Sequence, residues 1–153
     1  VSRFVHKTYK PSYKATMGLD LTLKKLAYQD EFIRIQLWDL ASQQSFAPMR
    51  GRFYTGSVGA ICVYDITRRP TFANLSKWLK ELQDNAGEID FAVLGNKSDL
   101  SGQYREITPD EGEEWAEEAG STFWSETSAK TGENVDESFM SLIESAMSSL
   151  STK

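Results

Sequence analysis

Two short apolar segments, separated by a helical segment, constrain the fold of this chain more than any other feature. Residues 58–64 (VGAICVY) end at Asp65, and residues 91–94 (FAVL) run directly into residues 95–97 (GNK). Short apolar runs without alternation are typical of strands buried on both faces of a parallel sheet. Between them, residues 70–85 carry apolar side chains at helical spacing. This order predicts an α/β fold in which right-handed crossovers join a mostly parallel sheet.

The segments on either side extend this pattern. Residues 19–23 and 32–38 alternate with period two around a short polar connection, which predicts an antiparallel hairpin. We expect one face of the hairpin to meet solvent, because its polar positions carry Asp20, Thr22, Arg34 and Gln36. The other expected elements are the end of a helix at 1–8, a loop at 9–17, a helix from Pro109, a strand at 122–126 and a helix at 134–149. Together they form one domain over residues 1–150, with a frayed tail at 151–153.

Composition narrows the class of protein. The 153 residues are 40% hydrophobic, which excludes a disordered chain, and no apolar run reaches the about 18 residues of a membrane-spanning helix. The net charge of -5 argues against nucleic-acid binding but leaves room for a small basic pocket that takes one phosphorylated ligand. Cys62, the single cysteine, lies in an apolar run, so we expect a buried structural thiol and a reducing, cytoplasmic setting.

Polar residues gather where the predicted strands end. In an open α/β sheet, ligands bind at the carboxyl ends of the strands. The segments at these ends are residues 39–43 (DLASQ), Asp65, residues 96–99 (NKSD) and residues 127–130 (TSAK). The sequence therefore predicts one functional rim built from several loops.

Asp99 gives this rim its most specific chemistry. A carboxylate offers two acceptor oxygens in one plane, and guanine offers two parallel donors that adenine lacks. A lysine such as Lys97 can lay its aliphatic stem along a base while its ammonium stays in water. In isolation an N-K-x-D tetrapeptide is more often an ordinary polar loop. Here it follows a buried strand, and a Ser-Ala-Lys tripeptide follows the next one, so we favour a guanine site.

With these motifs in order, the chain resembles a Ras-like small GTPase, and the Rab branch fits best. NKSD (96–99) and ETSAK (126–130) match the two guanine-recognition motifs of the family, and WDLASQQSF (38–46) resembles its WDTAGQERF. YKPSYKATMGLDL (9–21) resembles the first switch and the strand after it. The resemblance implies a P-loop GTPase fold, with a mostly parallel sheet, one antiparallel edge strand and helices on both faces.

The resemblance implies a role at the base for each matching position. Asp99 would pair with the guanine edge, Lys97 would lie along the base and sugar, and Asn96 would brace the site. Ala129 would offer its backbone N–H to the guanine oxygen, and Lys130 would cover the other face of the base. The nucleotide-binding residues implied here are Tyr9, Asn96, Lys97, Asp99, Ser128, Ala129 and Lys130.

It also implies GTP/GDP as ligand and Mg²⁺ as cofactor. Thr16 matches the threonine whose hydroxyl binds Mg²⁺ and whose N–H touches the γ-phosphate, and Asp39 would hold Mg²⁺ through a water. Gln43 matches the catalytic glutamine that orients the attacking water. Without the resemblance, Thr16 is an ordinary loop residue, Asp39 a helix cap and Gln43 a solvated side chain.

Partner proteins follow from the same resemblance. Two switches, at about residues 10–18 and 39–52, would contact an exchange factor, a GTPase-activating protein and effectors. Leu21, Trp38 and Phe53 match an exposed apolar triad with which Rab proteins bind effectors, although the three could equally be core residues. The expected process is membrane trafficking or related regulation.

One departure from the family weakens the expectation of an active switch. Ser42 stands where the family has the glycine of D-x-x-G, whose N–H binds the γ-phosphate. If the bound state needs positive φ, a β-carbon costs roughly 1–2 kcal/mol. We expect slow hydrolysis and weakened switching. The alternative is a pseudo-GTPase that serves as an interaction scaffold. A dinucleotide-dependent oxidoreductase is a weaker alternative, because no G-x-G-x-x-G is present.

The second departure concerns the phosphate loop. No G-x-x-x-x-G-K-[ST] occurs in the chain, which opens with Val1 inside the helix that follows this loop in the family. In the family, a strand upstream of that loop lies between the hairpin and the strand that ends at Asp65. We therefore expect that the physical polypeptide has further residues before Val1. A lipid anchor is not encoded in the given chain, so a peripheral membrane location would require a lipidated tail beyond Lys153.

Overall fold

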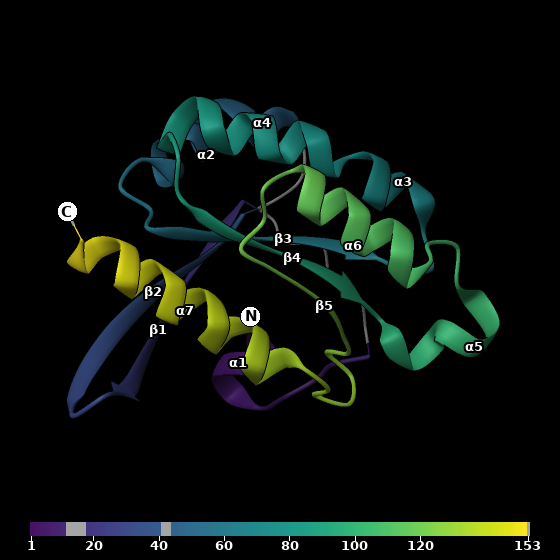
Figure 1. Ribbon diagram of the computed structural model, residues 1–153, viewed down its shortest axis with the longest axis horizontal. Coiled ribbons are helices and arrows are strands. Elements are labelled where there is room, and N and C mark those ends of the chain that lie inside the picture. Colours follow the sequence, from purple (N-terminus) through teal and green to yellow (C-terminus); the bar gives the residue numbers. More distant parts are fainter. Residues whose placement is uncertain (12–17, 41–43, 153) are drawn as a thin grey trace.

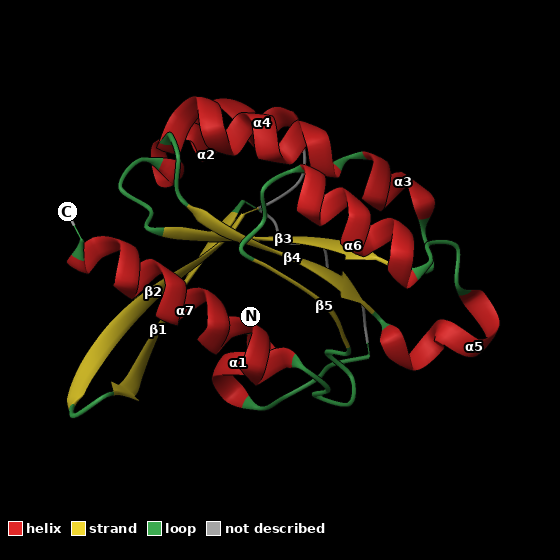
Figure 2. Cartoon of the chain, viewed as in Figure 1, coloured by secondary structure: helices red, strands yellow, loops and turns green. Residues whose placement is uncertain are grey.

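The computed structural model describes residues 1–11, 18–40 and 44–152 and forms a layered α/β structure. Figures 1 and 2 show helices α2, α3, α4 and α6 on one side of the strands, and helices α1 and α7 on the other. The chain therefore has the α/β fold, with helices on both faces, that its sequence predicts. The helices are α1 (Ser2–His6), α2 (Ala47–Tyr54), α3 (Arg69–Ala73), α4 (Leu75–Ala86), α5 (Ser101–Tyr104), α6 (Pro109–Glu118) and α7 (Val135–Ser151), with short 3-10 turns at Gln44–Phe46 and Ser98–Leu100.

Three parallel strands form the centre of the molecule. They are β3 (Gly59–Asp65), β4 (Asp90–Asn96) and β5 (Phe123–Thr127), in the order β3-β4-β5. Strand β4 is buried on both faces, as its apolar run predicts. Strand β3 is not, because Cys62 and Tyr64 face the main core while Val63, on the opposite face, is 53% exposed. The expectation that residues 58–64 are buried on both faces is therefore wrong for this strand.

The main core lies between the parallel strands and the helices above them. Its buried members include Tyr64 and Cys62 of β3, Leu75 and Leu79 of α4, and Ile107 before α6. Cys62 is buried as expected, and this burial raises the pKa of its thiol to about 11. The thiol therefore stays protonated at neutral pH, as suits a structural cysteine.

Strands β1 (Leu19–Tyr28) and β2 (Glu31–Leu40) form a separate antiparallel hairpin. They are longer than the alternating segments suggest, and a two-residue turn at Gln29 and Asp30 joins them. Gln29 has a φ of 52°, which places it in the left-handed region that tight hairpin turns require. The turn fixes the register of the hairpin, which pairs Leu21 with Trp38 and Thr22 with Leu37.

This register corrects the expected polar face of the hairpin. Asp20 and Thr22 lie on one face, whereas Arg34 and Gln36 lie on the other. The face with Arg34 and Gln36 is exposed and also carries the leucines at positions 21 and 23. On the other face, Lys24 lies 3.6 Å from the centre of the Phe4 ring and donates to the Phe4 carbonyl, so this face packs against α1.

The helices follow the predicted segments closely. The helix expected at 70–85 is divided into α3 and α4. Helical hydrogen bonds continue across the junction, from Asn74 N–H to the Pro70 carbonyl and from Trp78 N–H to the Asn74 carbonyl. Helix α6 begins with a capping box in which Thr108 accepts from the Glu111 N–H and Glu111 accepts from the Thr108 N–H. Helices α2 and α5 lie outside the elements that the sequence pattern predicts.

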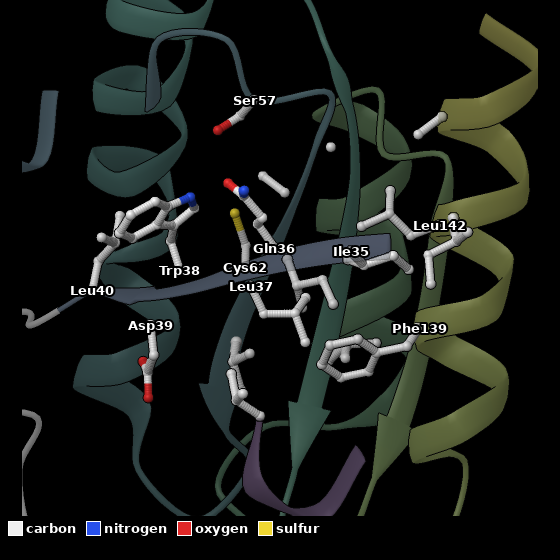
Figure 3. A pocket seen from close by; sticks show the side chains of 18 of the residues that line it. Ile35, Gln36, Leu37, Trp38, Asp39, Leu40, Ser57, Cys62, Phe139 and Leu142 are labelled. Atoms are coloured by element: carbon white, nitrogen blue, oxygen red, sulfur yellow. The ribbon is translucent and has the colours of Figure 1, made fainter. Parts of the chain in front are cut away.

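A groove separates the hairpin from the parallel strands. Among the described residues the strands form two sheets, one with the order β1-β2 and one with the order β3-β4-β5, so β2 and β3 each have an unpaired edge there. Figure 3 shows Ile35, Leu37, Cys62, Phe139 and Leu142 gathered along this groove, which has a volume of about 1300 Å³. Asp39, Asn96 and Ala129, from the carboxyl ends of β2, β4 and β5, line the same groove.

Candidate functional site

The polar residues predicted from the strand ends form one cluster at the carboxyl edge of the parallel sheet. Strand register places Asp65 opposite Asn96, and Asn96 opposite Thr127, at the last positions of β3, β4 and β5. The NKSD and SAK motifs follow directly, in the loops after β4 and β5. Two motifs that are about thirty residues apart in the chain therefore meet because parallel strands end at the same edge.

Asn96 ties the two loops together. Its Oδ1 accepts a hydrogen bond from the Ala129 N–H at 3.0 Å and a longer one from the Thr127 hydroxyl at 3.4 Å. The family resemblance implies that the Ala129 N–H binds a guanine oxygen, but in this structure it donates to the Asn96 amide oxygen. A ligand oxygen that binds there would replace or share this acceptor.

Asp99 is held by a buried serine. The hydroxyl of Ser128, which is 0% exposed, donates to Asp99 Oδ1 at 2.6 Å. The Asp99 side chain is 14% exposed, and Lys130 Nζ lies 3.8 Å from its Oδ2. A shielded carboxylate with one oxygen held by a hydroxyl has a fixed orientation and still has lone pairs to accept from a ligand.

Lys97 has a partner that the motif does not contain. Its backbone is left-handed, with φ 75°, and its Nζ lies 2.6 Å from Asp65 Oδ2 at the end of β3. Burial works to raise the pKa of Asp65, but hydrogen bonds from Lys97 and Thr67 outweigh it and hold that pKa below its usual value. Asp65 is therefore ionised at neutral pH and anchors the lysine head.

The remaining predicted ligand residues are only partly within the described structure. Tyr9 lies just after α1, 44% exposed, and Asp39 lies near the carboxyl end of β2. Thr16, Ser42 and Gln43 lie outside the described residues. Within the described parts of the chain, no group of three or more His, Cys, Asp or Glu side chains could hold a metal ion. Sites for Mg²⁺ in proteins often contain only one or two carboxylates, because the ion keeps several waters and binds substrate phosphates.

The three residues expected at an effector surface come together. Leu21 is the cross-strand partner of Trp38, and the centre of the Trp38 ring lies 5.0 Å from that of Phe53 in α2. Leu21 is exposed, and the two aromatic residues are half-buried. The three side chains therefore bridge the hairpin and α2 at the surface.

Sequence reasoning missed several residues that support the cluster. Asp65 appears in it only as a strand-end residue, although its register opposite Asn96 indicates that it lies next to the NKSD loop. Ser98 donates to Glu133 at 2.6 Å, which adds a further link between the two loops. Arg3 reaches the carbonyl of Ala129, and no local pattern connects residues 126 positions apart.

Nearly the whole chain matches a known protein family. The sequence profile of the Ras family matches residues 1–148, and the chain therefore belongs to the Ras family. It is 41% identical to the Ras-related protein RABA6b of Arabidopsis thaliana over 144 residues, which are 94% of this chain and 62% of that protein. It is also 40% identical to the Ras-related protein RGP2 of Oryza sativa subsp. japonica and 42% identical to RABA6a of Arabidopsis thaliana, again over 94% of this chain.

These relatives are longer than the chain. The matched region covers 65% of RGP2 and 61% of RABA6a, so the chain spans a little over three fifths of the curated relatives that it matches. In the described residues, no helix is both long enough and apolar enough to cross a membrane.

Proposed function

We propose that this chain is the guanine-nucleotide-binding part of a Rab-type GTP/GDP switch. The carboxylate of Asp99, oriented by the buried hydroxyl of Ser128 at 2.6 Å, carries this proposal. A fixed carboxylate accepts from the ring N–H and the exocyclic amine of guanine together, and adenine lacks that pair of donors. The membership in the Ras family supports the same assignment.

Two lysines flank the position proposed for the base. Lys97 is anchored through its head to Asp65 at 2.6 Å, and Lys130 lies 3.8 Å from Asp99. The aliphatic stems of these side chains would cover the two faces of a purine while their ammonium groups stay in water. The Ala129 N–H would exchange its Asn96 acceptor for the guanine oxygen, so that no buried donor is left unsatisfied.

We further propose slow, Mg²⁺-dependent hydrolysis of GTP. When bound, Mg²⁺ would neutralise part of the negative charge on the phosphates. Asp39 and Thr16 would hold the ion, and Gln43 would orient the attacking water. Asp39, near the end of β2, lines the same groove as Asn96 and Ala129 of the cluster, which supports a single site for the whole nucleotide.

The proposed output of the switch is the binding of other proteins. The contact of Trp38 with Phe53, and the pairing of Leu21 with Trp38, support an apolar binding surface that spans the hairpin and α2. Effectors, an exchange factor and a GTPase-activating protein are the proposed partners, and membrane trafficking is the proposed process. The names of the relatives, Ras-related RABA proteins, support this choice. We propose a cytoplasmic protein that acts at membrane surfaces.

Calorimetric titration with GDP, IDP and ADP tests the proposal. We expect GDP to bind more tightly than ADP, and the variant Asp99→Asn to lose at least tenfold in GDP affinity, because a hydrogen bond to a charged group contributes about 1.5–3 kcal/mol. The amide of asparagine presents one donor and one acceptor, so the variant should gain affinity for XDP, whose base carries a carbonyl in place of the amine. Asp84→Asn, a change at an exposed aspartate in α4, is the matched control. Equal affinities of the unmodified protein for GDP and ADP would exclude guanine recognition.

The scaffold alternative is favoured by Ser42, which replaces the glycine of D-x-x-G. A single-turnover assay with bound GTP distinguishes the two functions. A switch hydrolyses the nucleotide and slows further in Gln43→Leu, whereas a scaffold keeps GTP intact with either residue.

A further inference from the structure

We infer that Arg3 is a positioning residue for the base-recognition loop and that it sets the selectivity for the exocyclic amine of guanine. Arg3 lies in the short helix α1, far in sequence from both recognition motifs. Its Nε donates to the Ala129 carbonyl at 2.6 Å and its Nη2 donates to the Lys130 carbonyl at 2.5 Å. One guanidinium thus holds two successive carbonyls of the SAK loop. The inference rests on the proposed function, since it concerns how the same site chooses its ligand.

The helix that carries Arg3 is itself firmly placed. The ring of Phe4 stacks on that of Phe139 in α7, with 4.1 Å between centroids and an interplanar angle of 11°. Lys24 of β1 donates to the Phe4 carbonyl, and Lys7 lies 2.5 Å from Asp136 at the start of α7. In Figure 1, α1 lies next to the start of α7 and the loop that precedes it. The guanidinium therefore acts on the loop from a support fixed on two sides.

The carbonyl of Lys130 connects Arg3 to the rest of the loop. A trans peptide is planar, and its C=O and N–H point in opposite directions. While Arg3 holds the Lys130 carbonyl on one side, the N–H of Thr131 in the same peptide points to the other side, where it donates to the Ser128 hydroxyl at 3.1 Å. Arg3 therefore fixes the direction from which Ser128 receives its hydrogen bond.

Ser128 passes this orientation to the carboxylate. Because its oxygen accepts from Thr131 N–H, its own proton is directed to Asp99 Oδ1, at 2.6 Å. Asp99 must present both oxygens in one plane to bind the ring N–H and the amine of guanine. Loss of Arg3 frees the 130–131 peptide, removes the donor from Ser128 and lets the carboxylate rotate. The ring N–H would still find an oxygen, but the amine would not.

The ratio of GDP affinity to IDP affinity measures this alignment, because the base of IDP lacks only the amine. We expect Arg3→Ala to lower the ratio about tenfold, the size of one hydrogen bond to a charged group. Arg3→Lys keeps an ammonium group that can donate to one of the two carbonyls, so we expect a smaller decrease in the ratio. This variant allows the measurement to be made if Arg3→Ala does not fold. A purely structural role would weaken both nucleotides equally and leave the ratio unchanged, which would overturn the inference. Arg34→Ala, which removes an exposed arginine of β2, is the matched control and should leave the ratio unchanged.

A double-variant cycle tests the route through Ser128. If Arg3 acts through this hydroxyl, Arg3→Ala should have no further effect on the ratio in the Ser128→Ala background. Full additivity of the two changes would overturn the proposed route. If the unmodified protein prefers GDP to ADP but not to IDP, the inference fails while the proposed guanine site stands. If it binds GDP and ADP equally, both fail.

Discussion

Arg50 of α2 and Glu81 of α4 form a forked ion pair, with Nε–Oε1 and Nη2–Oε2 distances of 2.7 and 3.0 Å. Arg50 is 3% exposed, and its guanidinium lies 4.9 Å from the centre of the Trp78 ring. Beside it, a β-carbon on Gly51 would lie only 2.5 Å from Asn85 Oδ1, so α2 and α4 are in close contact. The helix that follows Ser42 and Gln43 is therefore fixed to the body of the domain at its centre.

Breaking this pair should destabilise the domain strongly. The variant Glu81→Gln leaves the buried guanidinium of Arg50 without its counter-charge, and we expect a loss of about 3 kcal/mol in the free energy of unfolding. The matched control is Asp84→Asn, which removes the exposed pair with Lys80 in the same helix and should cost less than about 1 kcal/mol. Urea denaturation of both variants measures the difference. Similar losses of unfolding free energy in the two variants would mean that the buried pair stabilises the domain no more than the exposed one.

Tyr54, which lies beside Arg50 and Glu81, should make the stability of the domain depend on pH in the alkaline range. Burial, together with the neighbouring Glu81 carboxylate, raises the pKa of Tyr54 to about 12. In the unfolded chain the phenol ionises near its ordinary pKa of 10.0, so folding stability is fully present below pH 10 and falls as the pH rises toward 12. The difference in unfolding free energy between the unmodified protein and Tyr54→Phe should be constant below pH 10 and then change in favour of the variant. A difference that stays constant up to pH 12 would contradict a raised pKa.

Gly112 of α6 is required by close packing rather than by backbone conformation. A β-carbon there would lie 2.1 Å from the Tyr64 hydroxyl and 2.9 Å from Trp124 Nε1, two groups that are themselves hydrogen-bonded at 3.3 Å. We expect Gly112→Ala to destabilise the domain by about 1–3 kcal/mol, despite the better helix propensity of alanine. Gly102→Ala is the control, because a β-carbon at that helical position has no neighbour within 4 Å. Thermal unfolding should separate the two variants, and an equally stable Gly112→Ala would mean that α6 moves away at little cost.

Ser42 should limit the response to GTP. If its position adopts positive φ when the γ-phosphate is bound, the β-carbon costs roughly 1–2 kcal/mol, so Ser42→Gly should raise the single-turnover rate of GTP hydrolysis about five- to thirtyfold. GDP affinity, which does not involve the γ-phosphate, serves as the internal control and should be unchanged. An unaltered rate, together with unaltered affinity for a GTP-dependent partner, would show that serine is tolerated there.

The local sequence pattern is sufficient to predict a helix or strand where the burial of its residues agrees with its hydrophobic periodicity. The apolar run of β4 predicts a strand buried on both faces, and the capping box at Thr108 marks the first turn of α6. The same reasoning was wrong for β3, since the face that carries Val63 opens toward the groove. Helix α2 was missed because Arg50 and Gly51 interrupt its apolar pattern, and its position depends on tertiary contacts with Glu81 and Asn85.

The candidate site likewise contains residues that the sequence predicts and residues whose contacts depend on tertiary packing. Asn96, Asp99 and Ser128 belong to motifs that follow strands, and parallel strand order is enough to bring them together. Arg3 could not be predicted, because its link to the loop depends on the packing of α1 against α7. The roles of Thr16, Ser42 and Gln43 rest on the family resemblance and stay predictions.

The groove between β2 and β3 also divides the backbone hydrogen bonds of the described structure into two sets. The hairpin is closed by its own strand pairs, and it meets the parallel strands and helices through side chains such as Leu26, Leu37 and Phe4. Strand β4 is paired on both sides and buried on both faces. Its amide protons should therefore exchange with solvent only when the whole domain unfolds, which makes β4 the slowest strand to follow by hydrogen exchange.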